Sequence, residues 1–310
     1  MKRIDLLITR SRKTTENDNF SDTQGIDDEE FLQYFNDGQD EIQSIIFNSF
    51  PDALQVETTI SAIAGQEAYN IPSDAFLGNR VEVVEYSPTG NSSDYIMLKK
   101  GAKRERISGV QSTPSYYIRR SKQILLQPQP QDSSGLIRIL YQKRVSRLDI
   151  RRATVSAVTL GASSITSLSF DTTSLLDDSA LLEEDRITIV GREGEVKMKN
   201  VLIDSINTST GVVTVNSGFT FDSGETIAVG DYAVRGQDST THSQLPQITE
   251  KYLLEYANLR INMRDSSQDS GAISSLLQKI ESTIKEAFSE PDGEVNYIPI
   301  LDSQYLEAED

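Results

Sequence analysis

The sequence of 310 residues contains no cysteine, no tryptophan and a single histidine, His242. The absence of cysteine excludes a disulfide, a thiolate zinc site, an iron–sulfur cluster and a cysteine nucleophile. One imidazole excludes a zinc site with two or three histidine ligands, and general-base chemistry that needs more than one histidine. The lack of tryptophan argues modestly against a site that stacks on sugars.

Long apolar runs are absent as well. No stretch approaches the roughly 18 uninterrupted apolar residues of a membrane-spanning helix, so we expect no membrane partner. The N-terminus begins with positive charge, as a signal peptide does, but its apolar run from Ile4 to Ile8 contains Asp5 and is too short. The product is therefore predicted to stay in the cytoplasm of the cell that makes it.

Basic residues are outnumbered: 30 Lys and Arg stand against 47 Asp and Glu, which gives a formal net charge of −17. This sign argues against affinity of the whole surface for nucleic acid. The charge is uneven, because residues 99–152 carry 14 Lys and Arg but only three acidic residues. Eight of these cations make up what we call the basic band: Lys99, Lys100, Lys103, Arg104, Arg106, Arg119, Arg120 and Lys122.

Hydrophobic residues make up 37% of the chain, enough to bury a core in one to three domains. Apolar side chains at three- and four-residue spacing predict a helix over 28–49, with Asp27 or Asp28 as N-cap. Gly38 costs stability in mid-helix, so we expect another element to pack closely there. Helices are also predicted over 247–263 and 272–288, folded back on each other as an antiparallel hairpin.

Two β regions lie between these helices. Period-two patterns and turn signals predict antiparallel strands over 55–60, 80–86, 115–119, 123–127 and 136–141. A second region, rich in Ser, Thr and Val, predicts strands of five to ten residues over 154–159, 165–170, 186–191, 201–206, 211–215 and 225–234. The change in composition predicts a separate small barrel or sandwich.

None of the sequence motifs GxSxG, GxGxxG and GxxxxGKS is present, and residues 191–194 (GREG) are typical of a turn between strands. His242 has Asp238 and Ser243 near it in the sequence, but a fold, not sequence proximity, brings triad members together. We interpret His242 as a solvated residue of a polar linker. We expect no enzyme activity, no catalytic residue, no metal site and no cofactor.

Five acidic residues flank Leu181 and Leu182: Asp177, Asp178, Glu183, Glu184 and Asp185. Their oxygens suit Ca²⁺ or Mg²⁺, but the spacing of an EF-hand loop is missing. A solvated loop between two strands is the preferred interpretation.

The basic band has three interpretations. Basic residues interleaved with Tyr116 and Tyr117 suit a nucleic-acid backbone. They also suit an acidic protein partner, and the terminal segments of this chain are acidic, so identical subunits could pack head to tail into a ring. The third interpretation is a plain solvated surface. We rank subunit contact first, solvated surface second and nucleic acid third.

Six short motifs then follow one another in order: 34–43 (YFNDGQDEIQ), 66–74 (QEAYNIPSD), 81–86 (VEVVEY), 113–118 (TPSYYI), 124–130 (ILLQPQP) and 137–144 (IRILYQKR). A return helix is expected over 244–261. This succession resembles the head-to-tail adaptor, or connector, proteins in the neck of tailed bacteriophages.

The resemblance implies an α+β fold: an adaptor-type helical bundle that carries an antiparallel β region. It implies a virion protein, assembled in the host cytoplasm into a ring of twelve copies beneath the portal. Such a ring takes part in DNA packaging and genome ejection, joins the portal protein to a tail or nozzle protein, and lets double-stranded DNA pass without sequence-specific binding. It also implies a C-terminal portal-docking arm, which we place at Tyr297, Ile298, Pro299, Ile300, Leu301 and Tyr305.

The chain departs from the simplest adaptor pattern by about ninety residues of β sequence before the return helix. We therefore expect an adaptor core over 1–150, an inserted all-β domain over 151–243, a helical hairpin over 244–290 and an extended arm over 291–310. The alternative is a tail or baseplate protein whose inserted domain binds host-surface carbohydrate, and behind it a hydrolase that uses Asp and Glu. Saturable glycan affinity would favour this alternative.

Overall fold

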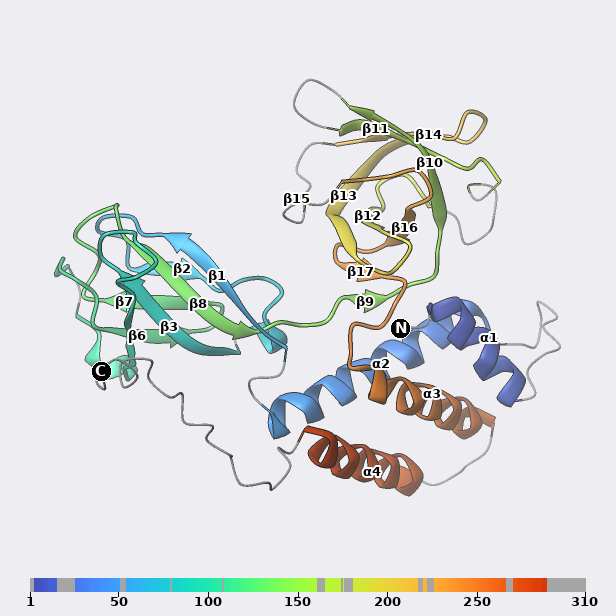
Figure 1. The fold of residues 1–310 in the computed structure, drawn as a ribbon, viewed down its shortest axis with the longest axis horizontal. Helices are drawn as coiled ribbons and strands as arrows, with labels where there is room; N and C mark the ends of the chain where they lie inside the picture. The colour runs from blue at the N-terminus through green and yellow to red at the C-terminus, as the bar shows by residue number, and fades with distance from the viewer. Residues whose placement is uncertain are drawn as a thin grey trace, which may run out of the picture.

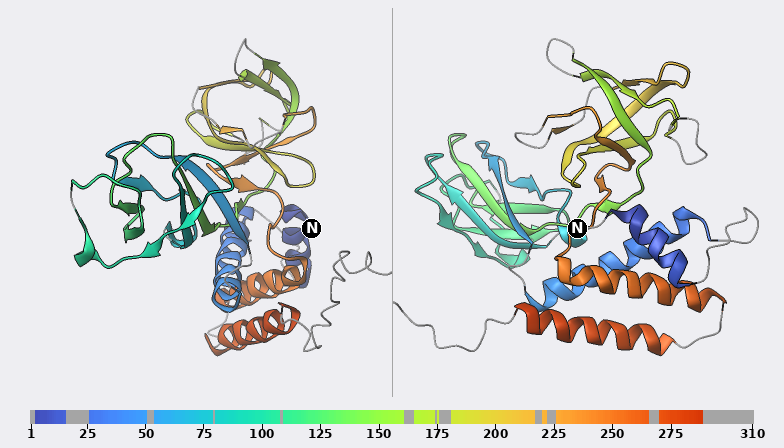
Figure 2. Two further views of the ribbon diagram at one scale, coloured as in Figure 1. Left: turned by 60° about the vertical axis from the view of Figure 1, so that its left-hand side comes forward. Right: turned by 45° about the vertical axis from the view of Figure 1, so that its right-hand side comes forward.

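The computed structural model describes residues 3–15, 26–50, 54–78, 80–107, 109–160, 165–173, 175, 181–216, 220–221, 226–265 and 270–288. These residues form three bodies, each with its own hydrophobic core. A group of helices, a two-sheet sandwich and a small barrel meet where the chain passes from one to the next (Figure 1). Figure 2 shows the same three bodies from two other sides.

The helical body contains α1 (Ile4–Thr14), α2 (Asp28–Ser49), α3 (Glu250–Asp265) and α4 (Ser270–Phe288). A short 3-10 turn, η4 (Gln247–Thr249), leads into α3. The predicted helix over 28–49 is confirmed at both ends, with the Asp27 side chain accepting from the Glu30 N–H at 2.7 Å. The predicted hairpin is also confirmed, since α3 and α4 lie side by side in opposite directions (Figure 1). No helix was predicted over 4–14, although Ile4, Leu7 and Ile8 make its buried face.

Gly38 lies where α2 meets α3, as its position in mid-helix predicted. A Cβ atom built on Gly38 would stand 2.8 Å from Cδ1 of Tyr256 and 3.3 Å from Cδ1 of Leu253. Both of these α3 side chains are buried. The glycine therefore permits a close approach of the two helices that any side chain would obstruct.

The sandwich occupies residues 54–145. One sheet has the order β1 (Gln55–Ser61), β8 (Leu136–Gln142), β3 (Val81–Ser87) and β4 (Ile96–Met97). The other has the order β2 (Ala68–Asn70), β7 (Gln123–Gln127), β6 (Tyr116–Arg120) and β5 (Lys99–Lys100). The short turns η1 (Phe76–Gly78) and η2 (Lys103–Glu105) lie in its loops. All five predicted strands are confirmed within one residue, but β5 pairs with β6 in parallel, so the region is not wholly antiparallel.

The barrel contains β10 (Ala153–Leu160), β11 (Ile165–Phe170), β12 (Arg186–Val190), β13 (Val196–Asn207), β14 (Val212–Val215), β15 (Thr220–Phe221) and β16 (Tyr232–Arg235). The order β12-β16-β10-β11-β14-β13 closes on itself because β13 also pairs with β12. The prediction that these strands have at most ten residues was wrong for β13, which has 12. A bulge lets β13 pair first with β12 and then with β14. The predicted strand over 225–234 begins only at Tyr232.

Two short strands carry the chain into and out of the barrel. β9 (Arg147–Leu148) precedes the barrel and β17 (Ser239–Thr240) follows it, and the two pair in parallel. The Asn36 side chain on α2 bonds to both backbone groups of Leu148, at 2.9 Å each. The barrel is thus attached through a narrow, hydrogen-bonded stem.

The α+β class is confirmed. A helical bundle as the main architecture is not supported, because in the described ranges four α-helices accompany seventeen strands. The β-rich character of both central regions agrees with the pattern of the sequence.

Candidate functional site

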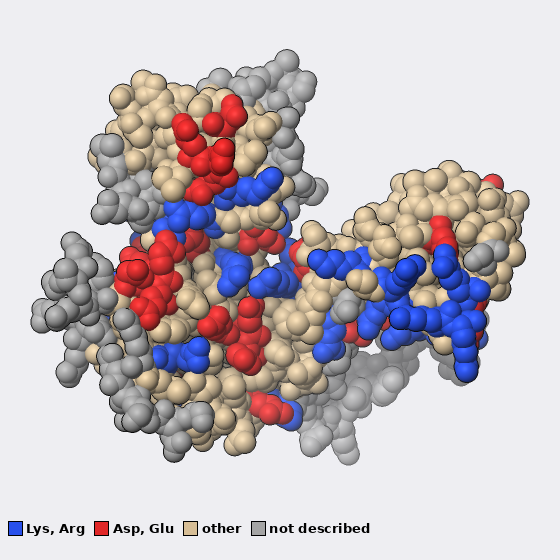
Figure 3. All heavy atoms as spheres, turned by 180° about the vertical axis from the view of Figure 1, so that it is seen from behind, with Lys and Arg blue, Asp and Glu red and all other residues tan. Residues whose placement is uncertain are grey.

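All eight residues of the basic band lie on or beside one sheet of the sandwich. β5 contributes Lys99 and Lys100, η2 contributes Lys103 and Arg104, and the end of β6 contributes Arg119 and Arg120. Lys122 lies in the turn between β6 and β7, with its side chain near Gly78. Figure 3 shows Lys and Arg gathered on one face of the sandwich, whereas acidic residues are prominent on the other two bodies.

One member of the band is already paired. Arg106 makes a two-pronged contact with Glu67, with Nε to Oε1 and Nη2 to Oε2 both at 2.6 Å. The Gln127 side chain also donates to Glu67 at 2.6 Å. These hydrogen bonds, that of Arg106 above all, hold the pKa of Glu67 below its ordinary value. Arg106 therefore fastens the loop that follows η2 to the sheet.

Most of the band has no such partner. In the part of the chain that the structure describes, no carboxylate lies within ion-pair distance of Lys99, Lys100, Lys103, Arg104, Arg120 or Lys122. All six side chains are exposed. Arg120 acts on Glu67 only from a distance, where its charge helps to lower the pKa of that carboxyl. A face with this many unpaired cations suits an acidic partner.

A hollow of about 340 Å³ opens among these cations. We call it the basic hollow, and its lining residues are Lys103, Arg106, Ile118, Arg120 and Leu125. Ile118 and Leu125 are buried strand residues that form an apolar floor, while the cations stand at the rim. Beside it, Ile107 is 42% exposed and its N–H donates to Gln127 Oε1 at 3.0 Å.

The candidate arm at Tyr297, Ile298, Pro299, Ile300, Leu301 and Tyr305 lies outside the described residues. Asp177 and Asp178 of the acidic cluster also lie outside them. The remaining three acids form a turn that leads into β12, where Asp185 pairs with Arg235 at 3.2 Å. Across the described ranges, no three His, Asp or Glu side chains gather as a metal site would require.

His242 is not solvated, so its interpretation as an exposed linker residue was wrong. It is 9% exposed, and its backbone pairs with Arg3 while Gly194 packs against its ring. The Thr241 hydroxyl lies 2.9 Å from Nδ1. Ser243 Oγ instead donates to Gln39 Oε1 at 3.4 Å, and Asp238 accepts from Ser146 at 2.7 Å, so the three residues form no triad. His242 thus joins the start of α1 and the 191–194 turn to the stem.

Burial lowers the pKa of His242, and the positive charge of Arg3 lowers it further. The folded protein therefore favours the neutral imidazole, and its contribution to stability is complete above the ordinary histidine pKa of about 6.5 and is lost as pH falls below it. We expect the stability advantage of the natural protein over His242→Asn to shrink between pH 7.5 and pH 5. Urea unfolding of both proteins across this range measures it. A difference that stays constant with pH would contradict the expectation.

A buried ionic cluster joins the barrel to the helical body. Arg152, whose side chain is 1% exposed, contacts Asp149 at 2.5 Å and Glu29 of α2 at 2.6 Å. The Asp149 side chain also accepts from the N–H of Arg235 in β16 at 2.6 Å. Sequence reasoning missed this cluster, because the positions 149 and 152 looked like part of one charged segment.

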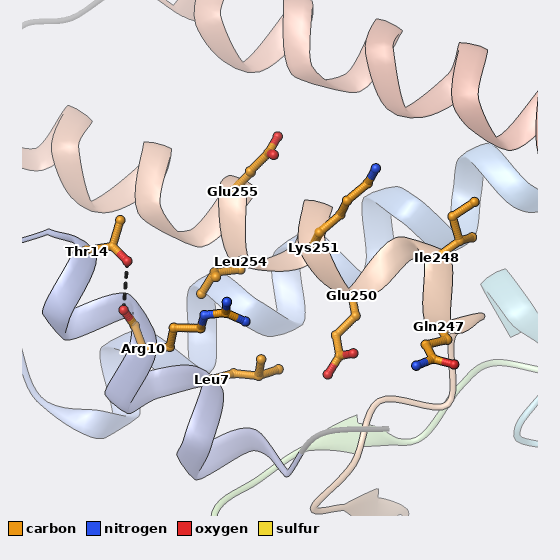
Figure 4. Close-up of a pocket in the computed structure, with 9 residues that line it drawn as sticks. All are labelled: Leu7, Arg10, Thr14, Gln247, Ile248, Glu250, Lys251, Leu254 and Glu255. Atoms are coloured by element: carbon orange, nitrogen blue, oxygen red, sulfur yellow. Dashed lines mark hydrogen bonds between the residues drawn. The ribbon is translucent and has the colours of Figure 1, made fainter.

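A second groove, of about 510 Å³, runs between α1 and α3 (Figure 4). Leu7 and Leu254 form its apolar part. Arg10 and Lys251 stand in it together with Glu250 and Glu255, so neither charge predominates. This groove therefore selects a charged partner less strongly than the basic hollow does.

Exposed cations without a carboxylate partner among the described residues, together with exposed apolar side chains such as Ile107, are typical of a surface that contacts another protein. A protein-family model described as SU10 adaptor protein matches residues 3–168, which include α1, α2, the whole sandwich and the first strands of the barrel. The chain belongs to this family of structural adaptors of bacteriophage particles, as the order of its motifs predicted. The family is not a known class of enzymes, and it implies contact with portal and tail components of the virion.

No curated protein matched the sequence. Within the described residues, no helix combines the length and apolar character that crossing a bilayer requires.

Proposed function

We propose that copies of this chain form a ring of twelve beneath the portal, where they join the capsid to the tail and extend the DNA channel. The family match over residues 3–168 is the observation that carries this proposal. It covers more than half of the chain and contains all six motifs. The ring takes part in packaging and ejection of the genome as a passive conduit.

The charge distribution supports a conduit. A net charge of −17 repels phosphate, and a wall that repels phosphate lets a duplex slide. The basic band occupies one face of the sandwich, where it suits an acidic surface of a neighbouring subunit better than a DNA lining. Double-stranded DNA would then pass without being held.

We assign the adaptor core to 1–150 and 244–290, and treat 151–243 as an inserted domain. The parallel pairing of Ser239 with Arg147 and of Thr240 with Leu148 supports this division, because the chain leaves the barrel beside the point where it entered. A domain inserted at such a stem leaves the backbone of the adaptor core on either side of it unchanged.

Residues 291–310 are proposed as an arm that docks on the portal. Deleting them is expected to leave the melting temperature of the chain unchanged within a few degrees, and to abolish its co-purification with the portal. Replacing only the charged residues of 302–310 by serine serves as the matched control and should retain binding. A truncated chain that still assembles on the portal would contradict the arm.

The test of the adaptor function is electron microscopy, with mass determination, of the chain co-expressed with the portal protein of its own genome. A ring stacked on the portal is the expected result. A chain that stays free of the portal while binding other tail components would overturn the proposed position in the particle.

A further inference from the structure

The turn before β12 carries an exposed leucine that is followed by acidic residues. Leu182 is 63% exposed, and Glu183 and Glu184 beside it are exposed too. We call these three residues the acidic tip. Several large apolar side chains of the described residues are exposed, and of these Leu182 is the one followed directly by two acidic residues.

The acidic tip is held in a defined shape. The N–H of Leu182 donates to the Asp185 side chain at 2.9 Å, and the N–H of Glu184 donates to the Ile203 carbonyl at 3.0 Å. Glu184 has a φ of 68°, a left-handed conformation that an ordinary residue adopts only when its surroundings impose it. The turn thus presents an apolar side chain and two carboxylates at little further cost in conformational entropy.

The basic hollow has the complementary character. Its floor is apolar, and its rim carries Lys103 and Arg120, which have no carboxylate within ion-pair distance in the described part of the chain. The exposed Ile107 extends the apolar surface next to Arg106. The acidic tip therefore offers an apolar group beside negative charges, and the basic hollow offers an apolar floor beside positive charges.

We propose that the acidic tip of one copy docks in the basic hollow of a second copy. Leu182 then contacts Ile107 and the floor of the hollow, and Glu183 and Glu184 lie against Lys103 and Arg120. The two surfaces lie on different bodies of the chain, so the contact is head-to-tail and generates a closed ring if its rotation closes. This inference rests on the proposed function and names the surfaces that join neighbouring subunits.

Cross-linking tests the contact directly, because the natural chain has no cysteine that could react. Full-length chains with Glu184→Cys are mixed with chains carrying Lys103→Cys, assembled on the portal and treated with a short bismaleimide. We expect cross-linked dimers and no larger product, since each chain has one thiol. The control replaces Glu184→Cys with Val229→Cys, which is 64% exposed at the opposite end of β12 and β16, and should give no dimer.

A ring seen by microscopy that gives no dimer, or equal dimer yields with Glu184→Cys and Val229→Cys, overturns the tip-and-hollow contact but leaves the adaptor function intact. A chain that does not assemble on the portal at all overturns both. The two failures are therefore distinguishable.

Charge reversal gives a second readout. Glu184→Lys alone and Lys103→Glu alone each place like charges together, and we expect each to raise the concentration for half-assembly at least tenfold. Chains with both substitutions restore opposite charges across the contact and should recover most of this loss. A double variant that assembles as poorly as the worse single variant would contradict the pairing.

Discussion

Replacing Arg152 with Met is expected to lower the free energy of unfolding by about 3–5 kcal/mol, because it leaves a buried carboxylate without its cation. Arg152 and Asp149 are both buried, and the guanidinium bonds to Asp149 at 2.5 Å through Nη2. Burial raises the pKa of Asp149, and the hydrogen bonds from Arg152 oppose that rise. Denaturant unfolding at pH 7 measures the loss.

Arg151→Met is the matched control. Arg151 is the exposed neighbour of Arg152 and contacts only the face of the Tyr232 ring, at 5.6 Å from its centroid, among the interactions that the described residues show. Its loss should cost less than about 1 kcal/mol. Equal costs for the two substitutions would contradict a special role of the buried cluster.

The pH dependence of Arg152→Met adds a second criterion. Without the guanidinium, burial and the charge of Glu29 still raise the pKa of Asp149 and only the hydrogen bond from the Arg235 N–H opposes them, so the pKa in the folded state lies above the unfolded value. Such a group stabilises the fold at low pH and loses this contribution as pH rises. The deficit of the variant should therefore be smaller at pH 5 than at pH 7. Glu29, whose side chain is 56% exposed, can be solvated in either case.

Local periodicity in the sequence predicts most of the long helices and strands. It does not predict the residues at which they end or the elements with which they pair. α2 and five strands of the sandwich were predicted because each has a strong pattern of its own. The sandwich strands β2, β4 and β5 were not predicted, because two or three residues are too few to show a period. β13 was cut short because its first half, VKMKN, alternates with lysines that look like loop residues, although Val196 and Met198 are buried in the barrel. α1 was missed because it was judged only as a leader sequence.

Long-range neighbours explain the remaining differences. His242 stands in a polar stretch, and only the folded chain brings Arg3 and Gly194 to it, from 239 and 48 residues away in the sequence. The basic hollow likewise needs β5, β6 and β7 to meet before Lys103 and Arg120 lie near one another. Sequence reasoning found the cations of this surface and the acidic residues beside Leu182, but not the apolar floor between the cations.

Gly38→Val is expected to destabilise the chain by about 3 kcal/mol, because the new side chain meets a packed interface that has no room for it. Its Cβ alone would stand 2.8 Å from the ring of Tyr256, which is 5% exposed and so has little freedom to withdraw. Gln33→Val, at an exposed position of the same helix, controls for the helix propensity of valine and should cost about 0.5 kcal/mol.

A double-mutant cycle with Tyr256→Ala separates steric conflict from a general weakening of α2. Tyr256→Ala removes the ring that the valine meets, so the double variant should be more stable than the sum of the two single losses by about 1–3 kcal/mol. Additive losses would mean that Gly38 serves the backbone of α2 and not its contact with α3. A favourable coupling free energy between the two substitutions would show that Gly38 acts at the crossing of α2 and α3, two helices that are more than 200 residues apart in the sequence. The first and last parts of the proposed adaptor core are then held together at this crossing.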